Sequence, residues 1–74
     1  MKEKLLAILK SLKEDVDFES QTAMVDDGVI DSLTLTTLIV ELEDAFGIEV
    51  DMEELVPENF NTVDAMLDMI SRLQ

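Results

Sequence analysis

The sequence predicts a small all-α protein, a four-helix bundle with three main amphipathic helices and one short helix. Three observations indicate this fold class. Apolar residues form 47% of the chain, enough for a hydrophobic core. They recur at spacings of three and four residues in three separate segments. With 74 residues the chain is near the size at which one core is just sufficient, so residues 1–74 are expected to form a single domain.

The first predicted helix covers Lys2 to Lys13, and its apolar residues form one stripe: Leu5, Leu6, Ile8, Leu9 and Leu12. Residues 14–28 have no sustained period and are rich in Asp, Ser and Thr, so they are expected to form a long loop. Loops of this length in compact domains are usually functional. Four apolar side chains are expected to hold it against the core: Val16, Phe18, Met24 and Val29.

The second predicted helix runs from Ser32 to Phe46, with its period carried by Leu35, Leu38, Ile39, Leu42, Ala45 and Phe46. Gly47 is expected to end it, because a residue without a Cβ adopts the left-handed conformation of a C-terminal cap. Asp31 is a candidate N-cap that would leave the Ser32 hydroxyl facing solvent. Capping by Ser32 itself is the alternative.

Two further helices are predicted after Gly47. Asp51 is expected to cap a short helical turn through Leu55, which Pro57 ends because the residue before proline avoids helical angles. Either Asn61 or Thr62 is expected to cap the last helix. That helix has one apolar face: Val63, Met66, Leu67, Ile70 and Leu73. Ile48 and Val50 alternate with acids as in a strand, but no second strand is available to pair with them.

The charge of the chain is strongly negative, with a formal net value of −13. Of the 18 acidic residues all but Glu3 lie between Glu14 and Ser71, a stretch without a single basic residue. Such a surface repels nucleic acid phosphates and anionic lipids, so neither is an expected partner. It attracts proteins with basic patches and speeds their encounter. Acids that merely keep a small domain in solution are the alternative explanation.

Residues for independent catalysis are scarce. The chain has no histidine and no cysteine, which excludes nucleophile pairs built on either residue, disulfides and thiolate metal sites. A cytoplasmic setting is therefore expected. Asp15, Asp17 and Glu19 alternate as in a calcium-binding loop, but Ser20 replaces the turn glycine and Asp26 the closing glutamate, so no metal site is predicted. No apolar run approaches the roughly 18 residues of a membrane span.

The segment DDGVIDSLTLTTLIVELEDAFGIEV, residues 26–50, poses the main functional question. A serine before an apolar-periodic run is usually a cap, but the positive end of a helix dipole also stabilises an attached phosphate ester. Both readings are open on these residues alone. The segment resembles the modification-site region of acyl carrier proteins, in which Asp-Ser-Leu opens the second helix. The resemblance extends over nearly the whole chain, including Phe-Gly-Ile-Glu-Val after that helix and Thr-Val at the last one.

The resemblance implies a carrier protein of four-helix-bundle fold. In this family 4′-phosphopantetheine, donated by coenzyme A, is esterified to the serine matching Ser32, with Asp31 and Leu33 beside it. The arm holds an acyl or aminoacyl group as a thioester. Partner enzymes supply the catalysis, so the chain is expected not to be an enzyme and to have no catalytic residues. Positions that match the partner-binding side of the second helix are Leu33, Val40, Glu43 and Asp44.

The expected partners are a phosphopantetheinyl transferase and an adenylating ligase, acyltransferase or synthase with basic patches, and the chain is expected to be a monomer. Thr34 and Thr37 occupy positions where carriers of fatty acid synthesis usually have acids. The Gly-Gly-His-Ser lead-in of modular peptide synthetases is absent. GVIDS and ENFNT are instead similar to stand-alone carriers, including D-alanyl carrier proteins and discrete carriers of secondary-metabolite clusters. An unmodified acidic helical protein-interaction module is the alternative function.

Overall fold

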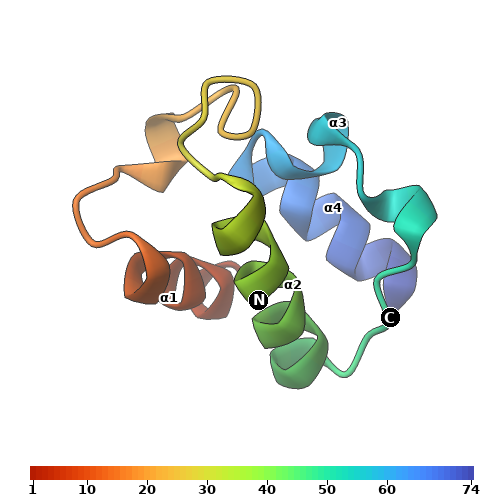
Figure 1. The fold of residues 1–74 in the computed structure, drawn as a ribbon. Helices are drawn as coiled ribbons and strands as arrows, with labels where there is room; N and C mark the ends of the chain where they lie inside the picture. The colour runs from red at the N-terminus through yellow and green to blue at the C-terminus, as the bar shows by residue number, and fades with distance from the viewer.

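The computed structural model describes all 74 residues and contains four α-helices (Figure 1). They are α1 (Lys2–Leu12), α2 (Ser32–Phe46), α3 (Pro57–Phe60) and α4 (Val63–Leu73). Single 3-10 turns at Phe18–Ser20 and Met52–Glu54 complete the ordered elements, and there is no strand. The predicted all-α four-helix fold is therefore confirmed. None of the helices combines the length and apolar character needed to cross a membrane.

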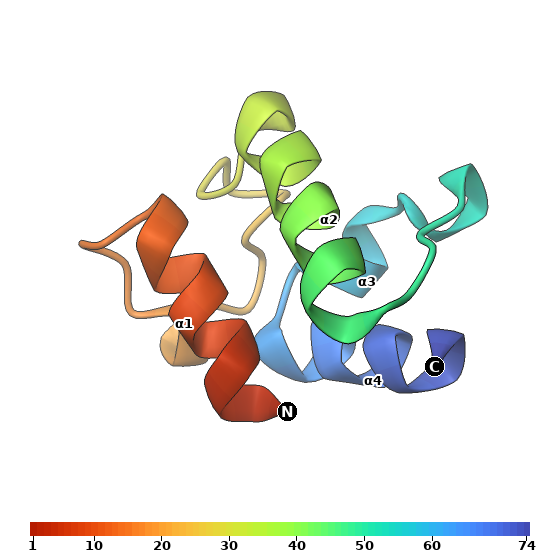
Figure 2. The ribbon, with the colours of Figure 1, turned by 90° about the horizontal axis from the view of Figure 1, so that it is seen from below.

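The three long helices enclose the core. α1 packs against both α2 and α4, while α3 packs against α4. Figure 2 shows α1 and α2 side by side, running in roughly opposite directions. The long loop between them lies at the end of the bundle where α2 begins (Figure 1). This arrangement places the start of α2 beside the loop and leaves one side of α2 uncovered.

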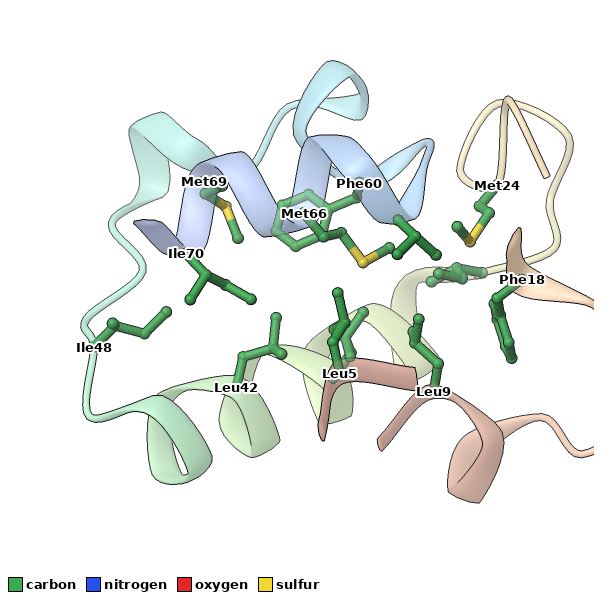
Figure 3. Close-up of a cluster of buried hydrophobic side chains, with 13 residues drawn as sticks. Leu5, Leu9, Phe18, Met24, Leu42, Ile48, Phe60, Met66, Met69 and Ile70 are labelled. Atoms are coloured by element: carbon green, nitrogen blue, oxygen red, sulfur yellow. The ribbon is translucent and has the colours of Figure 1, made fainter. Parts of the chain in front are cut away.

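The core consists of buried apolar side chains from every helix, the long loop and the α2–α3 connection (Figure 3). No polar or charged residue is buried. The predicted inward positions of α1, α2 and α4 are confirmed by the burial of Leu5, Leu9, Leu38, Leu42, Val63, Met66 and Ile70. Met69 is also buried, although it was not among the predicted face residues. Burial of these side chains is the main favourable term for folding.

The bounds of α2 follow from local sequence, as predicted. Gly47 has φ 64° and ψ 38°, the left-handed conformation that glycine adopts without a Cβ clash, and its N–H donates to Glu43 O at 3.0 Å. Lys4 of α1 donates from Nζ to the Ala45 carbonyl at 2.7 Å and lies 5.3 Å from the centre of the Phe46 ring. A cation at the carbonyl end of a helix is favourable, so this contact joins α1 to the end of α2.

The long loop is held to the core as predicted. Phe18 and Met24 are buried, while Val16 and Val29 are half-buried against the core. The loop also contains a 3-10 turn at Phe18–Ser20 that the aperiodic sequence did not indicate.

The connection from α2 to α4 differs from the prediction in where the short helix lies. The turn before Pro57 does end as predicted, with Val56 extended at φ −121° and ψ 148°, but the short α-helix begins at Pro57, which occupies the first position of α3. Proline suits that position because the first turn of a helix has free N–H groups, and its ring presets a helical φ. The predicted turn before it is the 3-10 turn at Met52–Glu54, which Asp51 precedes without a side-chain cap. Of the two candidate caps of α4, Thr62 is the one used: its Oγ1 accepts from Ala65 N–H at 2.9 Å.

Few of the acids have a basic partner. The ion pairs are Lys2–Glu19 at 3.1 Å, Arg72–Glu54 at 3.2 Å and Arg72–Asp68 at 3.7 Å, all at the surface. Surface pairs of this kind contribute little each. The remaining acids repel one another, which opposes the compact state.

We therefore expect added salt, or millimolar divalent cation, to raise the thermal unfolding midpoint of the unmodified chain. Screening of the acids should raise it by roughly 5 °C, the shift that about 1 kcal/mol produces in a domain of this size. Circular dichroism at 222 nm across a salt series measures the effect. An unfolding midpoint that changes with neither addition would show that repulsion among the acids contributes little to the free energy of unfolding.

Candidate functional site

The hydroxyl of Ser32 is free at the first position of α2. Ser32 is exposed, and its Oγ takes part in none of the hydrogen bonds of the chain. The cap of α2 is Asp31, whose Oδ1 accepts from Thr34 N–H at 2.8 Å. The prediction that Asp31 caps the helix and leaves Ser32 facing solvent is therefore confirmed, and capping by Ser32 is excluded.

A closed turn precedes the serine. Asp27 N–H donates to Ala23 O at 2.7 Å, and Ile30 N–H donates to Met24 O at 3.0 Å. Gly28 adopts φ 76°, a left-handed conformation that favours glycine at the tip of this turn. Ile30 is buried, with 2% of its surface exposed, and anchors the exit of the turn in the core. Ser32 is therefore only two residues from a fixed point.

Asp31 has the one clear electrostatic shift of the site. The hydrogen bond from Thr34 N–H lowers the pKa of the Asp31 carboxyl below its ordinary value, with smaller contributions from the Thr34 hydroxyl, the Lys13 charge and Leu33 N–H. Hydrogen bonds to the ionised form favour that form. Asp31 is therefore ionised at neutral pH, as its capping role requires.

One side of α2 forms an exposed stripe below Ser32. We define the α2 stripe as Leu33, Thr36, Thr37, Val40 and Asp44, all exposed and repeating at helical spacing. Leu33 is 82% exposed and Val40 is 59% exposed. The hydroxyls of Thr36 and Thr37 turn back to the helix and donate to Ser32 O at 2.9 Å and to Leu33 O at 3.2 Å. The stripe therefore presents the threonine methyl groups and the side chains of Leu33 and Val40, followed toward the end of α2 by the acid Asp44.

Glu43 does not belong to this stripe. It is half-buried, and its Oε2 accepts from Val50 N–H at 2.9 Å. Of the four positions matched to the partner-binding side of the second helix, Glu43 is therefore the one that is half-buried rather than exposed. Successive helical residues point about 100° apart, so Glu43 faces the α2–α3 connection and satisfies a backbone N–H there. The structure thus brings together Leu33, Val40 and Asp44 but not Glu43.

No cavity lies beside Ser32. The one cleft of the molecule, of about 210 Å³, is lined by residues of α1, the long loop and the start of α4: Lys2, Glu19, Gln21, Thr22, Thr62, Val63 and Asp64. No three acidic side chains converge in the manner of a metal site. The start of α2 is thus an open surface on which the Ser32 hydroxyl is exposed.

Presentation of a covalently attached group on an exposed helix defines a carrier domain, and sequence comparison agrees with this class. Residues 3–70 match a family described as "Phosphopantetheine attachment site". The chain belongs to this family of phosphopantetheine-binding carrier proteins.

Named relatives refine the likeness. The chain is 41% identical over 61 residues to a D-alanyl carrier protein of Streptococcus uberis (strain ATCC BAA-854 / 0140J), covering 82% of this chain and 77% of that protein. Over the same length it is 39% identical to D-alanyl carrier proteins of Streptococcus pyogenes serotype M5 (strain Manfredo) and Streptococcus equi subsp. zooepidemicus (strain MGCS10565), with the same coverage.

These likenesses confirm the predicted resemblance to acyl carrier proteins of the D-alanyl carrier type. The chain is a carrier protein that bears 4′-phosphopantetheine, and an unmodified interaction module is not favoured.

Sequence reasoning missed two features of the structure, of which the first lies at the site. Asn61 was considered only as a cap of α4, but its side chain bonds the turn before Ser32 instead. Met52 is 86% exposed, which makes it the most exposed large apolar side chain of the molecule. Met52 lies among acids and outside any apolar period, and this was the sequence signal that could have indicated its exposure.

The cap predicts a pH dependence of stability. Because the pKa of Asp31 is lowered in the folded chain, its stabilising effect is present above the unfolded pKa and is lost as pH falls through the lower folded value. We expect Asp31→Ala to melt at a lower temperature than the unsubstituted chain at neutral pH. The gap should shrink as pH falls below about 4. Thermal melts at several pH values measure it.

Asp27→Ala is the matched control, because Asp27 is an exposed acid of the same turn whose side chain makes no hydrogen bond. A gap for Asp31→Ala that persists unchanged at the lowest pH would refute the role of its charge.

Proposed function

We propose that Ser32 carries the phosphopantetheine arm and that the loaded arm delivers an aminoacyl group, of the D-alanyl kind, to partner enzymes. The free Ser32 hydroxyl at the start of α2 is the observation that carries this proposal. The hydroxyls of Ser11 and Ser20 are committed to Ile8 O and Asp17 O. Ser71 lies in the last turn of α4, the negative end of a helix dipole, which disfavours a phosphate. Ser32 alone combines a free hydroxyl with the positive end.

The neighbouring residues support attachment in different ways. Asp31 is fixed by its bond to Thr34, so it holds the first turn of α2 in place while the hydroxyl beside it reacts. Leu33 projects into solvent next to the serine, where it can contact a transferase. The bound arm supplies a thiol that holds the cargo as a thioester. The chain itself contributes attachment and orientation, and the partner enzymes contribute the catalysis.

The cargo proposal has two supports. The relatives named above are D-alanyl carrier proteins. The only cleft is lined mainly by polar residues that do not include Ser32 or its turn, and a short aminoacyl group needs no apolar cavity. Thr34 and Thr37, where carriers of fatty acid synthesis usually have acids, agree with this choice.

The proposed partners are a phosphopantetheinyl transferase and an adenylating ligase with basic patches. The net charge of −13 favours such surfaces. The α2 stripe is the proposed contact surface, with Leu33 and Val40 as its apolar part and Asp44 as its charge. Residues 1–74 act as one carrier domain and a monomer in this proposal. A cytoplasmic setting stays a prediction.

The attachment predicts that Ser32 alone is modified. Incubation with coenzyme A and a phosphopantetheinyl transferase should add one arm per chain, because one serine has the required geometry. Ser32→Ala should abolish the addition and leave the thermal midpoint nearly unchanged, since its hydroxyl makes no bond in the fold. Intact mass and peptide mass spectrometry measure both.

Ser71→Ala is the control, because it removes the other exposed serine whose hydroxyl makes no bond, and it should load normally. Full loading of the Ser32→Ala variant would refute the assignment. The loaded chain can then be offered ATP and D-alanine with an adenylating ligase specific for that amino acid. Failure to gain D-alanine by a chain that carries its arm would overturn the cargo proposal and leave the attachment intact.

The contact surface predicts a charge effect at Asp44. Asp44→Lys should slow loading at low salt by about twofold to fivefold through the association rate, the scale of one exposed charge pair. The salt dependence of loading should also become flatter. Steady-state loading across a salt series measures this. Asp64→Lys on α4 makes the same change of net charge away from the stripe, so an equal effect of both variants would contradict a local role for Asp44.

Glu43 requires a different variant, because Glu43→Lys would also remove the acceptor of Val50 N–H. Glu43→Gln removes the charge and keeps a carbonyl oxygen to accept that bond. The same salt series then reports the part that the Glu43 charge plays in partner encounter.

A further inference from the structure

Asn61 joins the α3–α4 junction to the turn before Ser32. Its backbone O accepts from Met24 N–H at 3.0 Å. Its side-chain Oδ1 accepts from Val25 N–H at 2.9 Å and from Asp26 N–H at 3.2 Å, while Nδ2 donates to Asp26 Oδ2 at 3.0 Å. Four hydrogen bonds thus reach one short segment from a single residue far along the chain.

The bonded segment is directly linked to the serine. Met24 donates from its N–H to Asn61 O, and its own carbonyl accepts from Ile30 N–H at 3.0 Å. Ile30 is buried and is followed by the cap Asp31 and then by Ser32. Asn61 therefore fixes one side of the closed turn whose other side leads into α2. The remaining backbone bonds that hold this turn are local, between residues 23 and 30.

The chemistry of the contact requires an amide. An asparagine side chain accepts through its oxygen and donates through its nitrogen, so it can satisfy two N–H groups and a carboxylate together. An aspartate of the same shape accepts only, and it would place a second negative charge against Asp26. Thr62 is the side-chain cap of α4, and Asn61 ends α3 only through its backbone N–H, so capping does not account for the asparagine side chain.

We propose that Asn61 is a positioning residue for the modification of Ser32. It holds the 23–30 turn in place from the α3–α4 junction and so fixes the Ser32 hydroxyl relative to the α2 stripe, on which the transferase docks. This proposal rests on the proposed attachment at Ser32. Asn61 does not touch the reacting atoms. It acts through the turn.

The test is the loading kinetics of Asn61→Asp with coenzyme A and a phosphopantetheinyl transferase. We expect kcat at saturating carrier to fall by about tenfold, because small displacements of a reacting group carry costs of this size or more. KM should change little, since the stripe is unaltered. A variant that is merely less stable would behave in the opposite way. The folded carrier is the substrate of the transferase, so a fraction of unfolded molecules lowers the concentration of usable substrate. This raises the apparent KM and leaves kcat unchanged.

Asn59→Asp is the matched control. Asn59 is also half-buried and also donates from Nδ2 to an acid, with Glu54 Oε1 at 3.2 Å, but it lies against the Met52–Glu54 turn instead of the turn before Ser32. It should keep the kcat of the unsubstituted chain. An equal loss of kcat in both variants, or no loss in Asn61→Asp, would overturn the proposal.

Rescue by exchange of the two partners tests the contact itself. In the double variant Asp26→Asn with Asn61→Asp, the aspartate accepts from the two N–H groups and the new amide donates to it, so the bonds are restored with the same net charge. We expect kcat to return to within about twofold, because contacting residues are strongly coupled. A double variant no better than Asn61→Asp would overturn the role of this contact.

Amide hydrogen exchange of the unmodified chain gives a readout that needs no transferase. The Val25 and Asp26 amides should exchange faster in Asn61→Asp and return to normal in the double variant; unchanged exchange would overturn the proposal even if Ser32 is loaded. If the unsubstituted chain is never loaded, the attachment at Ser32 fails, while the exchange data still decide whether Asn61 holds the turn. Should Asn61→Asp not fold, Asp26→Ala removes only the Nδ2 acceptor, and a normal kcat there would refute the proposal.

Discussion

The hydrogen bond from Thr34 N–H to the Asp31 carboxylate is the contact on which the rest of the site depends. The first turn of a helix has N–H groups that need acceptors, and a serine at the junction would ordinarily supply one. Because Asp31 takes this task, Ser32 moves to the first helical position with its hydroxyl unengaged. The same bond keeps Asp31 ionised and the start of α2 ordered. The start of α2 is thus capped while the Ser32 hydroxyl stays free, because the capping acceptor comes from Asp31 and not from Ser32.

Repulsion among the surface acids destabilises the folded chain. Three surface ion pairs do little to offset the repulsion among the acids of a chain with net charge −13. Stability therefore has to come from an entirely apolar core to which every helix contributes. Three basic residues reach across elements: Lys2 pairs with Glu19 of the long loop, Lys4 donates to a carbonyl at the end of α2, and Arg72 joins α4 to Glu54 and to Asn59 Oδ1. The charge left uncompensated is available for encounter with partners.

Local features could be predicted from the sequence, and long-range ones could not. The period of α2, its left-handed Gly47 and the choice of Asp31 as cap involve neighbours within one or two turns. The start of α3 at Pro57 was missed because proline is compatible with both the end of one helical segment and the start of the next, and only the first role was assigned to it. Asn61 and Glu43 were missed in their actual roles because their partners, the turn at Val25–Asp26 and the Val50 N–H, become neighbours only in the folded chain. The residues around Ser32 left capping and attachment open, and the family resemblance pointed to attachment.

The α2 stripe separates two contributions to partner recognition. Long-range attraction depends on the summed charge of the whole chain, and Asp44 is only one acid among many. Short-range fit depends on what the stripe presents at contact, and there the inward-turned hydroxyls of Thr36 and Thr37 leave methyl groups between Leu33 and Val40. In the proposed interaction, a partner approaches along the field of the entire acidic surface and is selected by a narrow, mostly apolar strip that ends at Ser32. In the role proposed for Asn61, the turn that it holds fixes the serine at the head of that strip, so that the docking surface and the hydroxyl keep one relative position.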